Sequence, residues 1–100
     1  MPNLSNSTPS DETLKKIEEL AKLFFVPSEI ALMLEINKEF FNESLKDEAN
    51  PIYKAFYTGF LQGEVDLRQC IMKLAISGSS PAQTMANDIL TRARFKLNKR

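Results

Sequence analysis

The feature that most constrains this chain is a long helical pattern between Pro51 and Ser77. Its apolar residues recur at helical spacing, but they do not form a single stripe. One side carries Ile52, Phe56, Phe60, Leu67, Ile71 and Leu74, and another carries Tyr53, Tyr57, Leu61, Val65, Met72 and Ile76. A helix that is apolar on more than one side is either central in its domain or shared between subunits. Its length, roughly 40 Å at about 1.5 Å per residue, favours sharing, because a chain of 100 residues has little material to cover both sides.

We therefore expect copies of the chain to associate through this helix, with an interface formed by Tyr53, Tyr57, Phe60, Leu61, Val65 and Met72. Base stacking is the alternative role for the aromatic residues, but their helical spacing favours packing against protein. Gly59 and Gly63 lie four residues apart and present no side chain, so another helix can approach closely there.

Shorter helical patterns cover about residues 10–24 and 27–34, a segment after Asn37, and residues 81–97. No strand pattern is present, so the sequence predicts an all-α fold. We expect a disordered N-terminus at residues 1–9 and a three-helix, helix-turn-helix domain at 10–49. A long antiparallel helical hairpin for packing and oligomerisation follows at 50–97, with a basic tail at 98–100. Gly78 should end the long helix in a left-handed conformation, and the last helix should pack back through Ala82, Met85, Ala86, Ile89, Leu90, Ala93 and Leu97.

The relative positions of Ala31, Ile36 and Phe41 indicate a helix-turn-helix between residues 27 and 45. Ala31 is small enough for a close helix crossing, Ile36 closes the corner beneath it, and Phe41 reaches back from the second helix. Glu35 stands where a left-handed residue is favoured, at an expected cost of about 1 kcal/mol relative to glycine. The alternative is an ordinary helical hairpin with similar spacing.

Several functional classes are disfavoured by composition. The chain has no histidine, no glycine-rich phosphate loop and a single cysteine, Cys70, which we expect to be a small buried apolar residue. We therefore expect a protein that is not an enzyme, with no cofactor and no metal. No window is apolar enough to span a membrane, the N-terminus does not resemble a signal peptide, and a lone cysteine fits a reducing cytoplasm.

Charge is distributed unequally along the chain, although its sum is zero. Residues 1–50 hold five Lys/Arg and ten Asp/Glu, and residues 51–100 hold eight Lys/Arg and three Asp/Glu. The basic end consists of Arg92, Arg94, Lys96, Lys99 and Arg100. These residues can bind DNA phosphates, or they can simply stabilise the negative end of a helix.

The order of these helices and motifs along the chain resembles that in the small terminase subunits of tailed bacteriophages and prophages. The resemblance covers roughly residues 17 to 95, in the segments "EIALMLEIN", "KEFFNESLKDEANP", "IYKAFYTGFLQGE", "LRQCIMKLAISGSSPA" and "TMANDILTRARF". It implies a non-catalytic protein in the cytoplasm of a bacterial host cell. Such a protein recognises double-stranded viral DNA, forms rings and regulates the large terminase subunit.

The second helix of the motif departs from that family, whose outer side is basic and aromatic where this chain has Asn42, Glu43 and Ser44. The expected DNA-facing residues are Asn37, Lys38, Asn42 and Lys46, the last three at a spacing of four. An adjacent stripe of Glu39, Glu43 and Asp47 would repel phosphates. Two further readings therefore stay open: a phage structural or adaptor protein that uses the motif for protein contacts, and a small dimeric transcription regulator.

Overall fold

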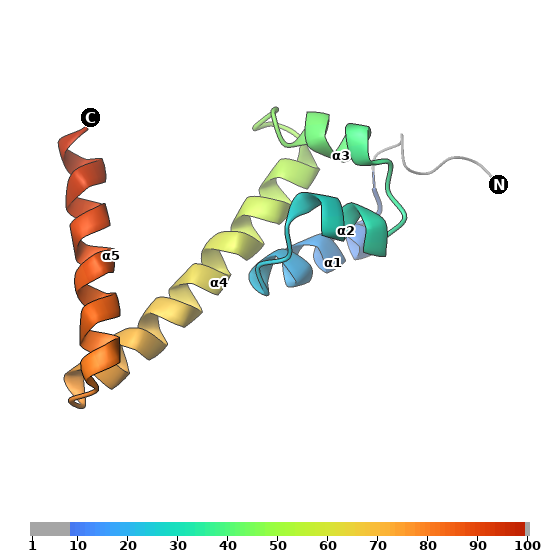
Figure 1. Ribbon diagram of the computed structural model, residues 1–100. Coiled ribbons are helices and arrows are strands. Elements are labelled where there is room, and N and C mark those ends of the chain that lie inside the picture. Colours follow the sequence, from blue (N-terminus) through green and yellow to red (C-terminus); the bar gives the residue numbers. More distant parts are fainter. Residues whose placement is uncertain (1–8, 100) are drawn as a thin grey trace. The chain divides into compact units, whose positions relative to one another are not determined.

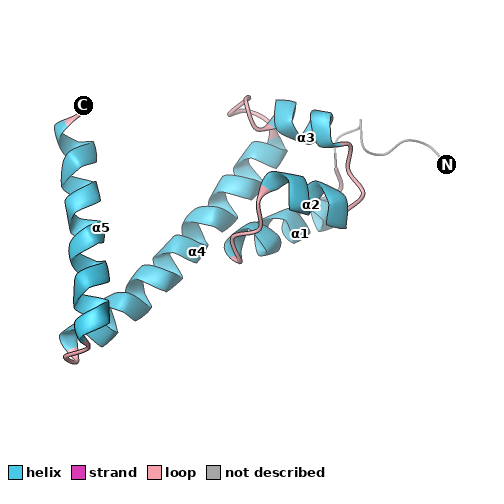
Figure 2. Ribbon diagram, viewed as in Figure 1, coloured by secondary structure: helices cyan, strands magenta, loops and turns pink. Residues whose placement is uncertain are grey.

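The computed structural model describes residues 9–99, which form helices with no strand among them (Figure 1, Figure 2). The helices are α1 (Asp11–Lys22), α2 (Pro27–Met33), α3 (Lys38–Ser44), α4 (Pro51–Ile76) and α5 (Ser80–Asn98). The all-α prediction is confirmed. Apart from Pro9, the segment predicted to be disordered lies outside the described residues, and so does Arg100 of the predicted basic tail.

Polar side chains begin several of the helices. The Asn37 side chain accepts a hydrogen bond from the Phe40 N–H at 2.9 Å, and the Asn50 side chain accepts one from the Ile52 N–H at 2.8 Å. These bonds satisfy backbone donors that have no partner inside the helix. Proline occupies the first position of α2 and α4, where its missing N–H is of no consequence. Asparagine is among the residues that most favour this capping position.

Left-handed residues end three of the helices. Their φ angles are 69° at Phe24, 56° at Glu35 and 106° at Gly78. In each case the next residue donates its N–H back to the last turn, a geometry that closes a helix sharply. These bonds join Phe25 to Leu20 at 3.3 Å, Ile36 to Ala31 at 2.8 Å and Ser79 to Leu74 at 3.0 Å. The predicted left-handed conformations at positions 35 and 78 are confirmed, whereas the one at Phe24 was not anticipated.

The chain divides into two compact units, and the division lies inside α4, between Glu64 and Val65. The first half of α4 therefore belongs with the three N-terminal helices. From the sequence we expected the domain boundary between residues 49 and 50, before α4 begins.

The first unit has one apolar core, to which all four of its helical segments contribute. Its buried members are Ile17, Ala21, Ile30, Ala31, Phe41, Ile52, Ala55 and Phe56. The rings of Phe41 and Phe56 meet edge to face with centroids 6.5 Å apart. Since Ile52, Ala55 and Phe56 come from α4, the helix-turn-helix shares its core with the start of the long helix.

A close contact between α1 and α4 follows from two glycines. A Cβ at Gly59 would collide with the carbonyl oxygen of Glu18, and a Cβ at Gly63 would collide with that of Lys22. The contacting positions advance together along both helices, so α1 and this half of α4 run parallel. The prediction that Gly59 and Gly63 admit another helix is confirmed, and the helix is α1 of the same chain.

The second unit consists of the end of α4, the turn at Gly78 and α5. Among its described residues only Ala82 is buried. The Gln83 side chain donates to the Ala75 carbonyl of α4 at 3.1 Å, and Ser79 caps α5. The predicted packing of α5 along α4 holds only near the turn, because Leu90 and Leu97 are exposed. The physical reason is that the large apolar residues of α5 are distributed around the helix rather than along one side.

Candidate nucleic-acid interface

The corner between α2 and α3 has the geometry of a helix-turn-helix. Ala31 is buried at the crossing, and Phe41 of α3 is fully buried beneath it. Ile36 packs against the same core, and its N–H donates to the Ala31 carbonyl across the corner. The outer side of α3 is thereby fixed toward solvent, which is the arrangement that such motifs use to present a recognition helix.

Two predicted DNA-facing residues, Lys38 and Asn42, lie one helical turn apart on α3, and both are exposed. Asn37 is exposed as well, but its side-chain oxygen is engaged as the cap of α3. A role in capping the helix is therefore established for Asn37 by the geometry, independently of any contact with DNA.

Lys46 does not continue the stripe that the spacing predicted. The helix ends at Ser44, so Lys46 lies in the following turn, where its Nζ forms an ion pair with Glu43 at 3.0 Å. Asp47, expected on the acidic stripe, also lies in this turn and accepts a hydrogen bond from the Ala49 N–H at 3.0 Å. The prediction continued α3 as far as Lys46 and Asp47 because the sequence shows no strong signal that ends a helix before Asn50.

Ser44 was expected on the outer side of α3, and this expectation is wrong. The residue is buried, and its hydroxyl donates to the Phe40 carbonyl at 2.8 Å. A serine that bonds back within its own helix can enter a core without leaving a polar atom unpaired. The outer side of α3 therefore presents fewer residues to solvent than the sequence suggested.

The basic residues of α5 form the second part of the candidate interface. Arg92, Lys96 and Lys99 are exposed and fall at i, i+4 and i+7, so they share one side of the helix. Arg94 is exposed on another side. The Lys99 ammonium lies 5.1 Å from the centre of the Phe95 ring, a distance at which a cation is attracted to an aromatic face. We call Arg92, Lys96 and Lys99 the basic row.

The predicted oligomer interface on α4 is only partly accessible. Phe60 is half-buried, and its ring contacts those of Phe24 and Phe56 at centroid distances of 5.4 and 6.1 Å, so it belongs to the core of the first unit. The Tyr53 and Tyr57 rings lie 4.5 Å apart, with Tyr53 half-buried. The exposed members of the predicted set are Tyr57, Leu61, Val65 and Met72.

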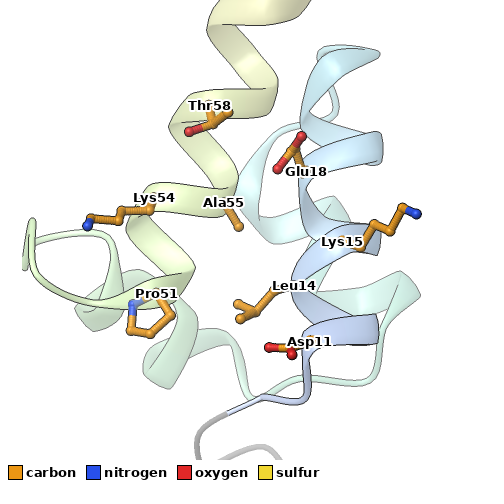
Figure 3. Close-up of a pocket in the computed structure, with 8 residues that line it drawn as sticks. All are labelled: Asp11, Leu14, Lys15, Glu18, Pro51, Lys54, Ala55 and Thr58. Atoms are coloured by element: carbon orange, nitrogen blue, oxygen red, sulfur yellow. The ribbon is translucent and has the colours of Figure 1, made fainter.

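Two surface hollows lie beside α4. In the first unit, a groove of about 530 Å³ separates α1 from α4, with an apolar floor and a charged rim (Figure 3). Its residues are Asp11, Leu14, Lys15, Glu18, Pro51, Lys54, Ala55 and Thr58. In the second unit, Val65, Met72 and their neighbours line another hollow of about 530 Å³. The groove was not predicted from the sequence, although the small Ala55, four residues before Gly59, continues the side on which α1 packs.

Cys70 is exposed, so the prediction that it is buried is wrong. Position 70 lies in the second unit, where Ala82 is the only buried residue among those described. Within residues 9–99, no group of three or more histidine, cysteine or acidic residues is arranged to hold a metal ion. No helix in the described part of the chain has both the length and the apolar character needed to cross a membrane.

Comparison of the chain with protein-family models, with curated proteins and with solved structures found no match in any of the three. The resemblance to small terminase subunits therefore stays a prediction from the sequence. What the chain itself establishes is an all-α protein with a helix-turn-helix in its first unit and a basic row in its second.

Proposed function

We propose that this chain is a non-catalytic DNA-binding protein of small-terminase type. It recognises double-stranded viral DNA, associates with copies of itself and regulates a large terminase subunit in the cytoplasm of a bacterial host cell. The observation that supports the proposal is the corner at Glu35, where the left-handed residue and the bond from Ile36 to Ala31 leave the outer side of α3 facing solvent, as a recognition helix requires.

In the proposed complex the two units have different tasks. Lys38 and Asn42 on α3 approach base edges, since a lysine can donate to guanine and an asparagine can pair with adenine. The basic row of α5 supplies attraction to phosphates, which normally provides most of the affinity of such complexes. This division offsets the repulsion that the acidic residues of α3 exert on the DNA backbone.

A second function, that of a phage structural or adaptor protein, is favoured by a specific observation on α3. Glu39 and Glu43 are exposed beside the predicted DNA-facing residues, and Lys46 is already paired with Glu43. A carboxylate about 4 Å from a phosphate is unfavourable by up to about 4 kcal/mol before salt screening. In that case α3 would bind a basic protein surface instead of DNA.

The test is fluorescence anisotropy with double-stranded DNA at low and moderate salt. Lys38→Glu places a negative charge at the start of α3 and should weaken binding about tenfold or more. Lys54→Glu makes the same change on an exposed residue of α4 in the same unit, and it should alter affinity by less than about twofold.

The two variants together separate the possible outcomes. Equal weakening by both would mean that α3 has no special place in the complex and would count against recognition by the motif. Absence of binding by the unmodified protein at low salt would reject the DNA-binding proposal and favour the adaptor function.

A further inference from the structure

The first unit displays exposed apolar residues on the turn between α1 and α2 and on the outer side of α2. Four of them are consecutive in the chain, and Leu32, with 80% of its surface exposed, is among the most accessible. We call this set the corner patch, after the turn between α1 and α2 and not the corner at Glu35. Its members are Leu23, Phe24, Phe25, Val26, Leu32 and Met33. Clusters of large exposed apolar residues on a small protein usually mark a surface that binds another protein.

The backbone of the corner patch is held in one conformation. Phe24 is left-handed, which is disfavoured for any residue with a Cβ, and its ring is fixed against Phe60. The N–H of Val26 donates to the Glu29 carboxylate at 3.0 Å. Strain of this kind persists where the surrounding structure enforces it, often at binding sites, and a preformed surface loses little freedom on binding.

The second unit carries a matching surface on α5. Leu90, Arg94 and Leu97 fall at i, i+4 and i+7, so they share one side of the helix, and all three are exposed. This side is different from the one that carries the basic row. Binding through Leu90 and Leu97 would therefore leave the basic row accessible to DNA.

The net charges of the two units indicate which of their surfaces bind each other. Residues 1–64 contain eleven Asp/Glu and six Lys/Arg, a net charge of −5, whereas residues 65–100 contain two Asp/Glu and seven Lys/Arg, a net charge of +5. Contact between two first units, or between two second units, brings like charges together. Contact between a first unit and a second unit brings opposite charges together and is favoured.

We propose that the corner patch of one copy binds the Leu90–Arg94–Leu97 side of α5 in a second copy. Glu19 lies four residues before Leu23, and Glu29 lies four residues before Met33, so carboxylates flank the patch on both helices and can attract Arg94. The inference rests on the self-association included in the proposed function, but not on DNA binding.

This contact joins two different surfaces, so an open chain of copies keeps one free corner patch at one end and one free α5 surface at the other. Such head-to-tail association produces a closed ring when the rotation between copies allows closure, and an open assembly otherwise. The exposed apolar side of α4 offers a single surface and cannot by itself generate that geometry.

The experiment measures molecular mass by light scattering coupled to size-exclusion chromatography, without DNA, at high micromolar concentration. Leu32→Glu disables the corner patch and Leu97→Glu disables α5; both side chains are exposed, so neither change disturbs a core. Arg94→Glu tests the charge without altering apolar contact. Thr84→Glu, on another exposed side of α5, is the matched control, and circular dichroism verifies that each variant remains helical.

The unmodified protein and Thr84→Glu should form an assembly larger than a dimer, and the other single variants should be monomeric. An equimolar mixture of Leu32→Glu and Leu97→Glu should form a one-to-one dimer and nothing larger, because only one intact pair of surfaces remains. A monomeric unmodified protein would overturn the inference, as would assembly that survives either leucine change or a mixture that does not pair. DNA binding measured on the unmodified protein and on Leu97→Glu tests the proposed function separately; Leu32→Glu is left out of this comparison because Leu32 and Lys38 line the same surface hollow.

Discussion

The carbonyl oxygen of Glu18 on α1 occupies the space that a Cβ at Gly59 on α4 would require. The same relationship recurs one turn later between Lys22 and Gly63. The obstacle is backbone in both cases, so it cannot move aside as the end of a flexible side chain would. The two glycines therefore set the distance between α1 and α4, and with it the packing of the first unit.

Replacing Gly59 by alanine should lower the free energy of unfolding. Alanine is the better helix former by about 1 kcal/mol, but separating two packed helices costs more than this, so we expect a net loss of about 1–3 kcal/mol. Urea denaturation followed by circular dichroism measures it. Thr58→Ala, at the exposed neighbouring position, is the control and should leave stability unchanged or slightly higher. Wild-type stability in Gly59→Ala would mean that α1 does not pack against α4 in solution.

Replacing Glu35 by glycine should raise stability. The left-handed conformation costs a residue with a Cβ about 1–2 kcal/mol, and the greater freedom of glycine in the unfolded chain cancels about half of the gain. The expected result is an increase of about 0.5–1 kcal/mol in the free energy of unfolding, measured by thermal or urea denaturation.

The corresponding change at Phe24 should behave differently, although its backbone is also left-handed. Phe24→Gly relieves the same strain but removes an aromatic ring that packs against Phe60. A ring pair of this kind contributes about 0.5–1.5 kcal/mol beyond the area it buries. We therefore expect Phe24→Gly to lower stability. If both substitutions stabilise equally, the contact between Phe24 and Phe60 has no energetic significance.

Asn37 combines a structural role with a predicted role in DNA binding, and two substitutions can separate them. Asn37→Ala removes the cap of α3 and should destabilise the protein by about 1 kcal/mol. Asn37→Asp keeps an oxygen that accepts from the Phe40 N–H, so stability should be close to that of the unmodified protein. If Asn37 lies near DNA, the added charge of Asn37→Asp should still weaken binding. Unchanged binding would confine Asn37 to capping.

The basic row should determine how DNA binding depends on salt. Each phosphate contact contributes about 0.9 to the slope of log affinity against log salt concentration. Changing Arg92, Lys96 and Lys99 to glutamine together should therefore reduce the slope by up to about 2.7. Changing Lys15, Lys16 and Lys54 of the first unit to glutamine removes the same number of charges and should alter the slope little. A reduction of the same size in this second triple variant would assign the attraction to overall charge.

Much of the fold could be predicted because its signals are local. The asparagine caps, the prolines that open helices and the left-handed positions at Glu35 and Gly78 each act within a few residues. The small residue at position 31 and the glycines at 59 and 63 also indicated helix contacts correctly. The sequence could not indicate that the partner of those glycines is α1, because nothing local distinguishes a helix of the same chain from a helix of another copy.

The predictions that failed depend on where helices end and on what lies opposite them. Lys46 was assigned to α3 by extending a regular spacing beyond Ser44. Ser44 was placed outside because it matches a position on the outer side of the helix in the family that the sequence resembles. Cys70 was expected to be buried because free cysteines usually are. Phe60 is the opposite of Cys70: it was expected at an exposed interface between copies, and the structure places its ring in the core of the first unit, against Phe24.

The inclusion of the start of α4 in the first unit has a consequence during synthesis. The N-terminal helices have no complete set of partners until Ile52, Ala55 and Phe56 have been made, and α1 acquires its last neighbour only with Gly63. Nascent chains of which only about the first 50 residues have emerged should therefore be sensitive to protease on the ribosome, and resistance should appear only after residue 63 has left the exit tunnel.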